Sequence, residues 1–331
     1  MADELALTSK GVPPRGGGPS SDGLPSRITA WLSQERVFRL IPFIMVEVTF
    51  IFLLAIPFIM TIYIAFLKWR ASWPFEKAYF TGLYNFKAVL GKEDFWAAIG
   101  RTFYFAGVAV SMELIIGFIM AMFLYREFWG RKFFITIFLI PMMVVPVVVG
   151  YNFSMIYVDS GPLNQILRPL MEFLGLNPRI RWLSYPLAAQ WAVILADVWQ
   201  WTSLTFLIFL SGFSALPQQL MNAARIMGAS RLQIFWRIQL PLLKPAIMIA
   251  VIIRTMEALK LFDQAVLLTF GGPGTATETI AFYLWRNVWL FNKYSFGAAA
   301  SVLLLIFFAF LIYLGIYLLV RERATLEKEG L

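Results

Sequence analysis

The chain alternates between long apolar stretches and short polar segments. An α-helix needs about 20 apolar residues to cross the ~30 Å hydrocarbon core of a bilayer. Six stretches reach this length, and we predict one membrane-spanning helix in each of 42–66, 103–124, 133–157, 187–210, 246–268 and 297–320. Pro57, Pro141 and Pro146 predict kinks in the first and third helices, because proline removes a backbone hydrogen bond. The pattern predicts an all-α membrane protein in which residues 36–325 form a six-span bundle.

The two ends of the chain lack such stretches. Residues 1–35 contain three consecutive glycines with scattered proline and serine, so we predict a disordered tail there. We do not expect a signal peptide, because no apolar segment follows a basic start. Residues 326–331 are predicted to form a second, short tail. An even number of spans places both tails on one side of the membrane.

Positive charge indicates which side that is. Lys and Arg are more frequent in cytoplasmic than in external segments. With both tails inside the cell, the inner segments carry 15 Lys and Arg residues and the outer segments, of similar total length, carry 11. The excess is modest, and it predicts that both termini are cytoplasmic.

Composition restricts the possible chemistry. The chain is 60% apolar, against roughly 45–50% for soluble domains, so lipid must solvate much of it. It has no cysteine and no histidine, which excludes thiol nucleophiles, histidine bases, disulfides and the usual transition-metal ligands. The net charge of +9 is explained by basic residues that flank the spans, and no basic module predicts nucleic-acid binding.

Two outer segments have features of their own. Residues 162–174 place leucine, isoleucine and phenylalanine at helical spacing, which predicts a short amphipathic helix on the outer interface or capping the bundle. Pro169 predicts a kink in it. The run Gly271-Gly272-Pro273-Gly274 predicts a tight, irregular loop. A phosphate-binding role for these glycines is disfavoured, because no Lys-Ser/Thr follows them and no strand precedes them.

The longest inner loop, residues 216–245, is predicted to fold into two short helices. The first covers 218–227, and Gly228 can end it in a left-handed conformation. The second covers 231–239 and is expected to stop at Pro241. Such a helix–turn–helix would form a rigid projection, and its plainest structural role is to lie against its own bundle.

The spacing within this loop resembles the EAA signature of ABC-importer permeases, which reads Glu-Ala-Ala, three residues, Gly, nine residues, Ile-x-Leu-Pro. The matching residues are Asn222-Ala223-Ala224, Gly228 and Ile238-Gln239-Leu240-Pro241. The resemblance implies a type I permease whose loop is the coupling helix that seats in a groove of an ATPase subunit. The residues implied in this coupling are Asn222, Ala223, Ala224, Arg225, Gly228, Arg231 and Pro241. Asn222 replaces the usual Glu, so any salt bridge made by that Glu is not expected here.

The resemblance extends over roughly residues 40–320. Within the family, the chain is similar to the carbohydrate branch, which includes the maltose and glycerol-phosphate permease subunits. The residues that carry it are Gly82-Leu83-Tyr84-Asn85-Phe86, Phe95-Trp96, Phe262-Asp263, Thr269, Gly271-Gly272-Pro273-Gly274 and Thr277-Glu278-Thr279. It implies import of a sugar or sugar-like solute across a bacterial inner membrane. It also implies an ATPase dimer, a second homologous permease and an extracytoplasmic solute-binding protein as partners. The chain has no Walker A sequence, so ATP is expected on the ATPase partner and no cofactor or metal on this chain.

Charged residues inside the predicted spans are candidates for the solute path. Arg254, Glu257, Lys260 and Asp263 recur every three residues with alternating sign along the predicted fifth span. Neighbours at this spacing can form ion pairs, so one hypothesis is a purely structural ladder. The other is that Glu257, Lys260 and Asp263 border a wet path and hydrogen-bond to solute hydroxyls.

Other residues complete the candidate set. We assign Asn152 and Trp199 to the same solute path. Glu113 and Asp197 are lone carboxylates in apolar spans and are expected to pair with a cation of the fifth span.

Two other functions remain open from the residues alone. A secondary transporter would use the buried carboxylates to couple uptake to an ion gradient, but it leaves the 216–245 loop unexplained. A membrane enzyme based on Asp and Glu would need carboxylates that converge near one membrane face, whereas here they are scattered over four spans. We therefore predict a permease subunit without catalytic residues of its own.

Overall fold

A computed structural model describes residues 35–70, 72–177 and 179–328. These residues form helices and one short antiparallel strand pair, β1 (Leu67–Lys68) with β2 (Tyr79–Phe80). Five of the described helices are long and apolar enough to cross a membrane, or six if one bent pair counts as a single span. The predicted tail 1–35 lies outside the described residues apart from Glu35, as do positions 329–331 of the second tail.

The chain divides into two units, residues 1–60 and residues 61–331. In the first unit, α2 (Glu35–Phe50) continues through a π-helical segment, η1 (Ile51–Ala55), into α3 (Ile56–Ala65), which ends in the second unit. Together they contain the span Pro42–Ala65, which agrees with the first predicted helix.

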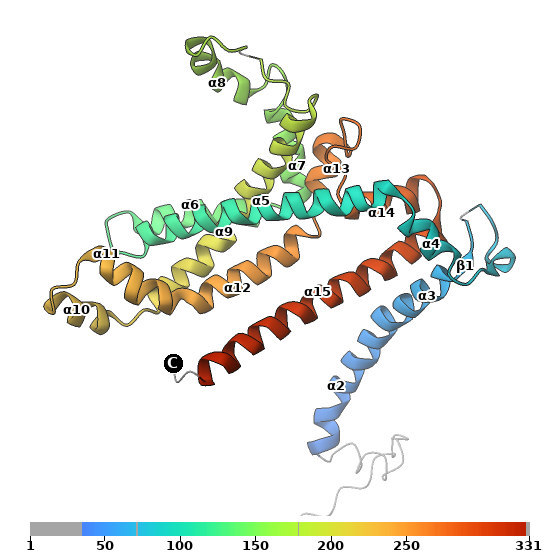
Figure 1. Ribbon diagram of the computed structural model, residues 1–331, viewed down its shortest axis with the longest axis horizontal. Coiled ribbons are helices and arrows are strands. Elements are labelled where there is room, and N and C mark those ends of the chain that lie inside the picture. The colour runs from blue at the N-terminus through green and yellow to red at the C-terminus, as the bar shows by residue number, and fades with distance from the viewer. Residues whose placement is uncertain (1–34, 71, 178, 329–331) are drawn as a thin grey trace, which may run out of the picture. The chain divides into compact units, whose positions relative to one another are not determined.

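The second unit is built around long helices that Figure 1 shows in chain order. Its longer helices are α5 (Glu93–Leu124), α6 (Arg131–Met143), α7 (Pro146–Ile156), α8 (Pro162–Phe173), α9 (Pro186–Ser214), α12 (Leu240–Ala258) and α15 (Tyr294–Lys328). Its shorter helices are η2 (Phe75–Lys77), α4 (Tyr84–Leu90), α10 (Gln218–Ile226), α11 (Arg231–Ile234), η3 (Phe235–Gln239), α13 (Asp263–Thr269), α14 (Ile280–Trp285) and η4 (Arg286–Leu290).

Helices α5 and α9 form the most extensive helix pair of this unit. They approach closely at Gly117, where an added side chain would collide with Thr205 of α9. The Thr205 hydroxyl also donates a hydrogen bond of 2.8 Å to the backbone carbonyl of Glu113. This pair therefore holds the candidate residue Glu113 at a fixed position.

The third predicted span is not one straight helix. Helices α6 and α7 meet at a bend of 98°. Val144 and Val145 between them are extended, with ψ of 129° and 135°, and Pro146 disfavours a helical conformation in the residue before it. A kink was predicted at Pro146, and the helix is interrupted directly before this residue. The size of the bend could not be predicted, because hydropathy reports the length of an apolar stretch and not its direction.

The predicted boundaries around the fifth span were wrong. The second helix of the inner loop does not stop at Pro241, because α11, η3 and α12 form one continuous helix, Arg231–Ala258. The π-helical turn of η3 shifts the hydrogen bonds to i→i+5 just before the proline, which lies in the first turn of α12. The helix then ends at Ala258, and residues 263–269 form the separate helix α13.

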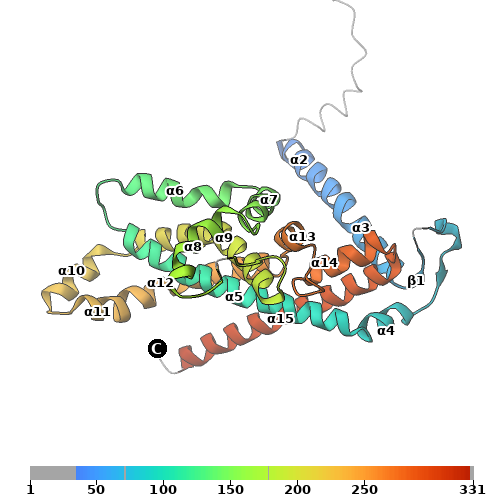
Figure 2. The same ribbon diagram turned by 90° about the horizontal axis from the view of Figure 1, so that it is seen from above.

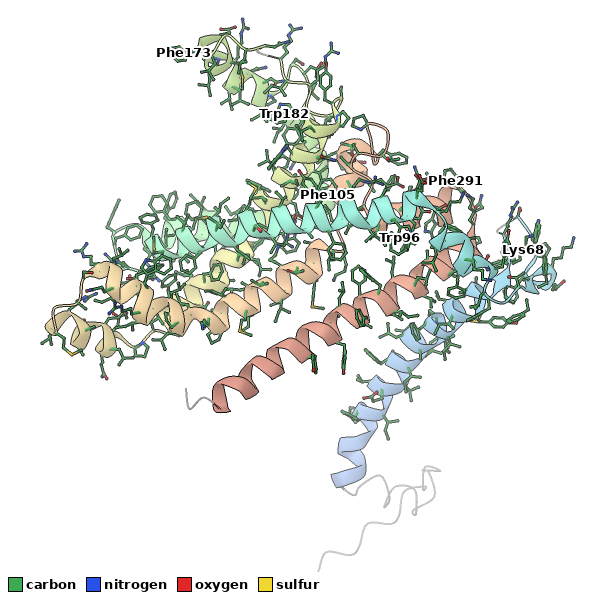
Figure 3. The ribbon with its side chains drawn as sticks, in the orientation of Figure 1. Lys68, Trp96, Phe105, Phe173, Trp182 and Phe291 are labelled. Atoms are coloured by element: carbon green, nitrogen blue, oxygen red, sulfur yellow. The ribbon has the colours of Figure 1, made fainter. Side chains whose placement is uncertain are left out.

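The amphipathic helix predicted over 162–174 is present as α8, with Pro169 inside it. Asn164 anchors it: its amide donates to the backbone carbonyl of Ile180 at 2.9 Å, and its oxygen accepts from Trp182 Nε1 at 3.0 Å. Trp182 lies between the helix and the rest of the unit, whereas Phe173 lies at the outer side of the helix and is exposed (Figure 3).

Candidate functional site

The loop of residues 216–245 folds into the short helix α10 and the first turns of the continuous helix Arg231–Ala258, joined by a tight turn. We call residues 217–239 the knob. In two perpendicular views the knob projects beyond α6 (Figure 1, Figure 2). Gly228 in the turn has a φ of +85°, the left-handed conformation in which glycine avoids the cost of a side chain. A β-carbon at Gly228 would meet no atom within 4 Å. The backbone conformation, and not a lack of space, is the reason for glycine here.

The start of α11 is fixed by a reciprocal cap. The Ser230 hydroxyl accepts from the backbone N–H of Gln233 at 3.3 Å, and the Gln233 side chain accepts from the Ser230 N–H at 2.7 Å. This capping box satisfies backbone N–H groups that the first helical turn leaves free. Arg231 is the first residue of α11 and is exposed. Gly228 and Ser230 thus define the turn from both sides.

The inner face of the knob is packed. Met221, Ala224 and Ile234 are buried in an apolar cluster that also contains residues of α5, α9 and α12. The Gln239 amide donates to the sulfur of Met221 at 3.0 Å, which joins the first helix of the knob to the segment leading into α12. The knob and α12 therefore form one packed body.

The outer face of the knob is apolar and uncovered. Ile226 is 88% exposed and Met227 is 81% exposed, and Leu232 is also exposed. A group of large exposed apolar side chains at the tip of a projection is typical of a surface that contacts another macromolecule.

The other predicted coupling residues lie on different faces of the knob. Asn222 and Arg225 are exposed, and the Arg225 guanidinium donates to the Asn222 oxygen at 3.0 Å. Ala223 is exposed, but Ala224 is buried within the knob, so only Ala223 of this pair can face another protein. Pro241 lies outside the knob, inside the continuous helix.

Three charged side chains from three helices meet inside the unit; we call them the ion triad. Arg254 of α12 donates through Nη2 to Glu113 of α5 at 2.7 Å and to Asp197 of α9 at 2.9 Å, and its Nε pairs with the second oxygen of Glu113. None of the three side chains is more than 3% exposed. The guanidinium also lies 5.2 Å from the ring centre of Trp201.

The ion triad explains the lone carboxylates of the second and fourth spans. Burying a charge costs several kcal/mol unless it is paired and hydrogen-bonded. Arg254 supplies partners for both Glu113 and Asp197, as expected for a cation of the fifth span. Neither carboxylate is free for another role in this arrangement.

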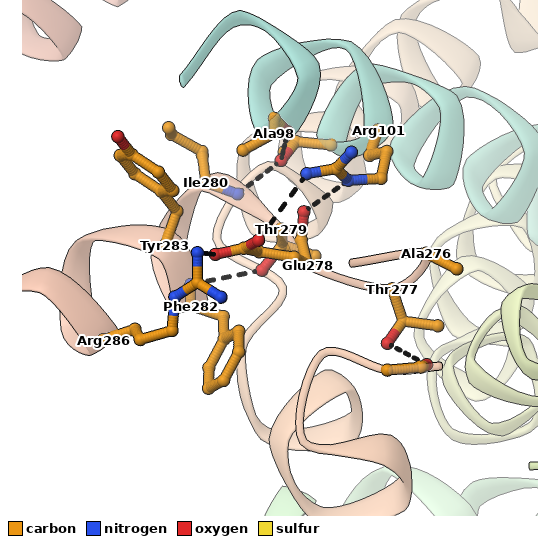
Figure 4. A network of polar contacts seen from close by, with 12 residues as sticks. Ala98, Arg101, Ala276, Thr277, Glu278, Thr279, Ile280, Phe282, Tyr283 and Arg286 are labelled. Atoms are coloured by element: carbon orange, nitrogen blue, oxygen red, sulfur yellow. Dashed lines mark hydrogen bonds and ion pairs between the residues drawn. The ribbon is translucent and has the colours of Figure 1, made fainter. Parts of the chain in front are cut away.

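A second buried cluster, which we call the outer cluster, lies at the glycine-rich loop. The Glu278 carboxylate is fully buried between Arg286 at 2.8 Å and Arg101 at 3.8 Å. The two arginines approach it from different sides (Figure 4). Burial raises the pKa of Glu278, while the charges of Arg286 and Arg101 oppose that rise. Among the described residues, neither carboxylate oxygen has a well-formed hydrogen bond.

Hydrogen bonds attach the same loop to its neighbours. Arg101 Nε donates to the backbone carbonyl of Glu278 at 2.9 Å. The Thr279 hydroxyl donates to the carbonyl of Leu261 at 2.7 Å, and the Thr102 hydroxyl accepts from the N–H of Ile280 at 2.8 Å. The predicted irregular loop is present, and it connects α5 with the segment that follows α12.

The predicted charge ladder is not a single helical array. Arg254 points into the ion triad, α12 ends at Ala258, and Asp263 begins the separate helix α13. Glu257 and Lys260 do pair, at 2.7 Å, but their side chains are 44% and 66% exposed. The structural ladder is therefore reduced to one exposed pair.

The remaining path candidates lie near a groove of about 540 Å³ between α5, α6 and α9. Trp199, Thr202 and Ser203 line it. Trp199 is half-exposed and its ring contacts that of Phe153 edge-on, with 5.4 Å between centroids. Asn152, the residue before Phe153 on α7, is exposed but does not line the groove. The structure places Trp199 at the groove and does not include Asn152 among its lining residues.

Sequence reasoning missed a pair of buried amides. Gln264 of α13 donates to Gln200 of α9 at 3.0 Å, and Gln200 donates to the backbone carbonyl of Val144 at 2.8 Å. This chain of hydrogen bonds supports the break between α6 and α7. Neutral amides do not stand out in an apolar span as charges do, so only the closeness of Gln200 to Asp197 and of Gln264 to Asp263 in the sequence could have indicated them.

A family model for binding-protein-dependent transport system inner membrane components matches residues 113–324. The chain belongs to this family. The match covers the ion triad, the knob and the groove residues, and it confirms the predicted family. This protein is thus an inner-membrane permease component of an ABC importer, not an enzyme.

Relatives and solved structures agree with this. The chain is 38% identical over 250 residues to a probable ABC transporter permease protein of Sinorhizobium fredii, covering 75% of this chain and 78% of that protein. It is 39% identical to the trehalose/maltose transport system permease protein MalF of Thermococcus litoralis, covering 68% and 74%. A bacterial ABC transporter involved in alginate import has a chain with a TM-score of 0.72 at 21% identity, covering 88% of this permease and 98% of that chain. The last match confirms the predicted fold class.

Proposed function

We propose that this permease moves a sugar-like solute, of the disaccharide or short oligosaccharide class, with energy from a separate ATPase subunit. The relatives support the solute class. One is named for trehalose and maltose, one for trehalose alone, and one for sulfoquinovosyl glycerol. These names share a glycosidic solute rich in hydroxyl groups, which a permease would recognise through aromatic rings and hydrogen-bonding side chains.

The knob is the observation that carries the ATP-driven mechanism. Its turn is fixed by Gly228 and Ser230, its inner face is packed onto α12, and Ile226 and Met227 are uncovered at its tip. A docking surface needs both an apolar contact and a rigid connection to the part that moves. We propose that the tip seats in a groove of the ATPase, with Ala223, Asn222 and Arg225 at the margin of the contact.

The proposed docking to an ATPase also implies the orientation of the permease in the membrane and its partner proteins. The ATPase is cytoplasmic, so the knob and both termini lie on the cytoplasmic side, in agreement with the distribution of Lys and Arg. We further propose a second, homologous permease, an ATPase dimer and an external solute-binding protein. One similar solved transporter was crystallised with a pentasaccharide-bound periplasmic protein, which supports the last of these.

We propose that the solute passes along α9 near Trp199. The half-exposed indole offers an apolar face for a sugar ring, and Thr202 and Ser203 contribute to the wall of the same groove. Glu257 and Lys260 form an exposed pair that can exchange its internal hydrogen bond for bonds to solute hydroxyls. Asp263 and Asn152 complete the candidate path.

Uptake by reconstituted complexes tests the proposal. Vesicles that contain this permease with its second permease and ATPase should accumulate trehalose or maltose when ATP and the solute-binding protein are supplied. The matched control is this chain alone in the same vesicles, which should take up neither sugar under a proton or sodium gradient. Gradient-driven uptake by the single chain would instead establish a secondary transporter and overturn the proposal.

A further inference from the structure

The knob and the ion triad belong to the same helix. The continuous helix begins at Arg231, in the knob, and ends at Ala258. At 1.5 Å per residue, about 35 Å separates Arg231 from Arg254 along it. Because both lie on one continuous helix, a displacement of the knob along the helix axis also displaces Arg254.

Apolar clusters flank the ion triad on both sides. On the knob side, an apolar cluster that includes Leu124 and Leu243 joins all three helices. On the other side, another apolar cluster includes Phe105 and Ile194. Apolar contacts have no preferred direction, so they hold helices together without fixing how far one has slid along another.

The contacts of Arg254 do have direction. Its guanidinium bonds at the same time to Glu113 of α5 and to Asp197 of α9, with Nη2 distances of 2.7 and 2.9 Å. A slide of α12 by one helical turn, about 5.4 Å, would carry both contacts well past hydrogen-bonding distance. Breaking these contacts would leave buried charges unpaired, which is costly. When α12 moves, α5 and α9 are therefore expected to move with it.

We propose that Arg254 is a positioning residue for transport: through Glu113 and Asp197 it makes α5, α9 and α12 move as one body, so that a displacement of the knob reaches the groove at Trp199. Asp197 lies two residues before Trp199 on α9, so the point of attachment is next to the groove. The inference rests on the proposed docking of the knob to an ATPase.

A single introduced cysteine can report this movement. The chain has no cysteine of its own, so Trp199→Cys is a unique label site on it. The complex of this chain with its second permease and ATPase is treated with a membrane-impermeant maleimide, either without nucleotide or with ATP and vanadate. Labelling of this chain is then measured after the subunits are separated, so that no transported solute needs to be known.

The informative variant is Arg254→Lys, which keeps the charge but loses the forked contact to two carboxylates. In the unaltered background we expect the labelling rate to differ between the two nucleotide states by at least about fivefold, the lower end of typical coupling between sites. Arg254→Lys should remove most of that difference while ATP is still hydrolysed. The single variant Arg254→Glu should also lose the difference, and the exchange Glu113→Arg with Arg254→Glu should retain most of it, because the triad is rebuilt with its charges in new places.

Two controls separate this inference from the proposed function. Arg168→Lys alters an exposed, ion-paired arginine outside the triad and should leave the difference unchanged. Gly228→Asp distorts the knob and should abolish it. If neither Gly228→Asp nor the nucleotide state alters labelling, the proposed docking of the knob to the ATPase is wrong, and the inference about Arg254 is wrong with it.

Other results overturn the inference alone. A full labelling difference in Arg254→Lys, with Gly228→Asp still disruptive, would show that the triad does not transmit movement. If hydrolysis and labelling in Arg254→Lys fall only as far as the amount of assembled complex falls, Arg254 serves folding only. Failure of both Arg254→Lys and the charge-exchanged variant to assemble would lead to the same conclusion.

Discussion

The two buried charge clusters contain the same kinds of residue in opposite proportion. The ion triad has two carboxylates around Arg254, and each carboxylate is hydrogen-bonded to it. The outer cluster has two arginines around Glu278, with one ion pair at 2.8 Å, the other at 3.8 Å, and no well-formed hydrogen bond to the carboxylate among the described residues. Only the first arrangement fixes the relative position of its helices, because only there do both pairs have bonding geometry.

The difference also reflects where each cluster lies. The triad joins three long helices between apolar clusters, where water cannot replace a lost partner. The outer cluster joins the start of α5 to a loop and η4, and the side chains of Arg101 and Arg286 remain partly accessible. The same chemistry is therefore expected to contribute much more to stability in the triad than in the outer cluster.

The largest effect is expected from Arg254→Met. The change leaves two buried carboxylates without their cation, and breaking a buried ion pair in this way costs about 3–5 kcal/mol. We expect a lower yield of assembled complex and a marked loss of thermal stability. Thermal unfolding of the detergent-solubilised complex measures it, and a melting temperature within error of the unaltered protein would contradict the assigned role of the triad.

A smaller effect is expected from Glu278→Gln. The amide keeps the shape of the side chain and, like the protonated carboxyl that burial favours, it carries no charge. The partly accessible arginines can turn toward water, so the loss should not exceed about 1 kcal/mol. The same unfolding assay, run beside Arg254→Met, tests the ranking. A loss for Glu278→Gln equal to or greater than that for Arg254→Met would break the comparison between the clusters.

The pH dependence of stability sharpens the comparison further. The folded state raises the pKa of Glu278 above its ordinary value of 4.5 through burial. The folded state then binds this proton more tightly than the unfolded state, so the contribution of Glu278 to stability is highest below 4.5 and falls as pH rises through the raised pKa. Unfolding measured from below 4.5 to neutral pH should show this decline in the unaltered protein. A profile for Glu278→Gln with the same slope would contradict it.

The smallest effect on stability is expected from the exposed pair Glu257 and Lys260. Exposed ion pairs contribute about 0–1 kcal/mol, so the exchange Glu257→Lys with Lys260→Glu should leave the melting temperature nearly unchanged. If the two residues border the solute path, sugar uptake should nevertheless remain impaired in the assembled complex. Full uptake in the exchanged variant would remove both residues from the path.

Much of the fold could be predicted from the apolar pattern, because lipid demands long apolar helices. The existence of each apolar span, the amphipathic helix α8 and the irregular glycine-rich loop follow from local sequence. The size of the bend at Val144 and Val145 and the continuation through Pro241 do not. Both depend on how hydrogen bonds rearrange around a proline, through an extended pair in one case and a π turn in the other.

The site divides in the same way. The turn at Gly228 was predictable, since a glycine between two helical segments marks a left-handed residue. The spacing of three that made Arg254 look like part of a ladder was misleading, because its partners Glu113 and Asp197 come from helices distant in the chain. Tertiary contacts of this kind, like the bond between Gln200 and Gln264, leave no periodic signal in the sequence.

The variant Gly228→Asp tests whether the knob couples this permease to ATP hydrolysis. An aspartate must adopt a left-handed backbone at Gly228, at a cost of about 1–2 kcal/mol, and it places a charge beside the apolar tip. Asn222→Ala is the matched change on the same knob, and it removes only the exposed hydrogen bond to Arg225.

The measurement is sugar-stimulated ATP hydrolysis by the reconstituted complex, with assembly monitored in parallel. We predict that Gly228→Asp assembles in the membrane but loses stimulated hydrolysis and uptake together, while Asn222→Ala retains most of both. Normal stimulation and uptake in the assembled Gly228→Asp complex would show that the knob does not transmit energy from the ATPase.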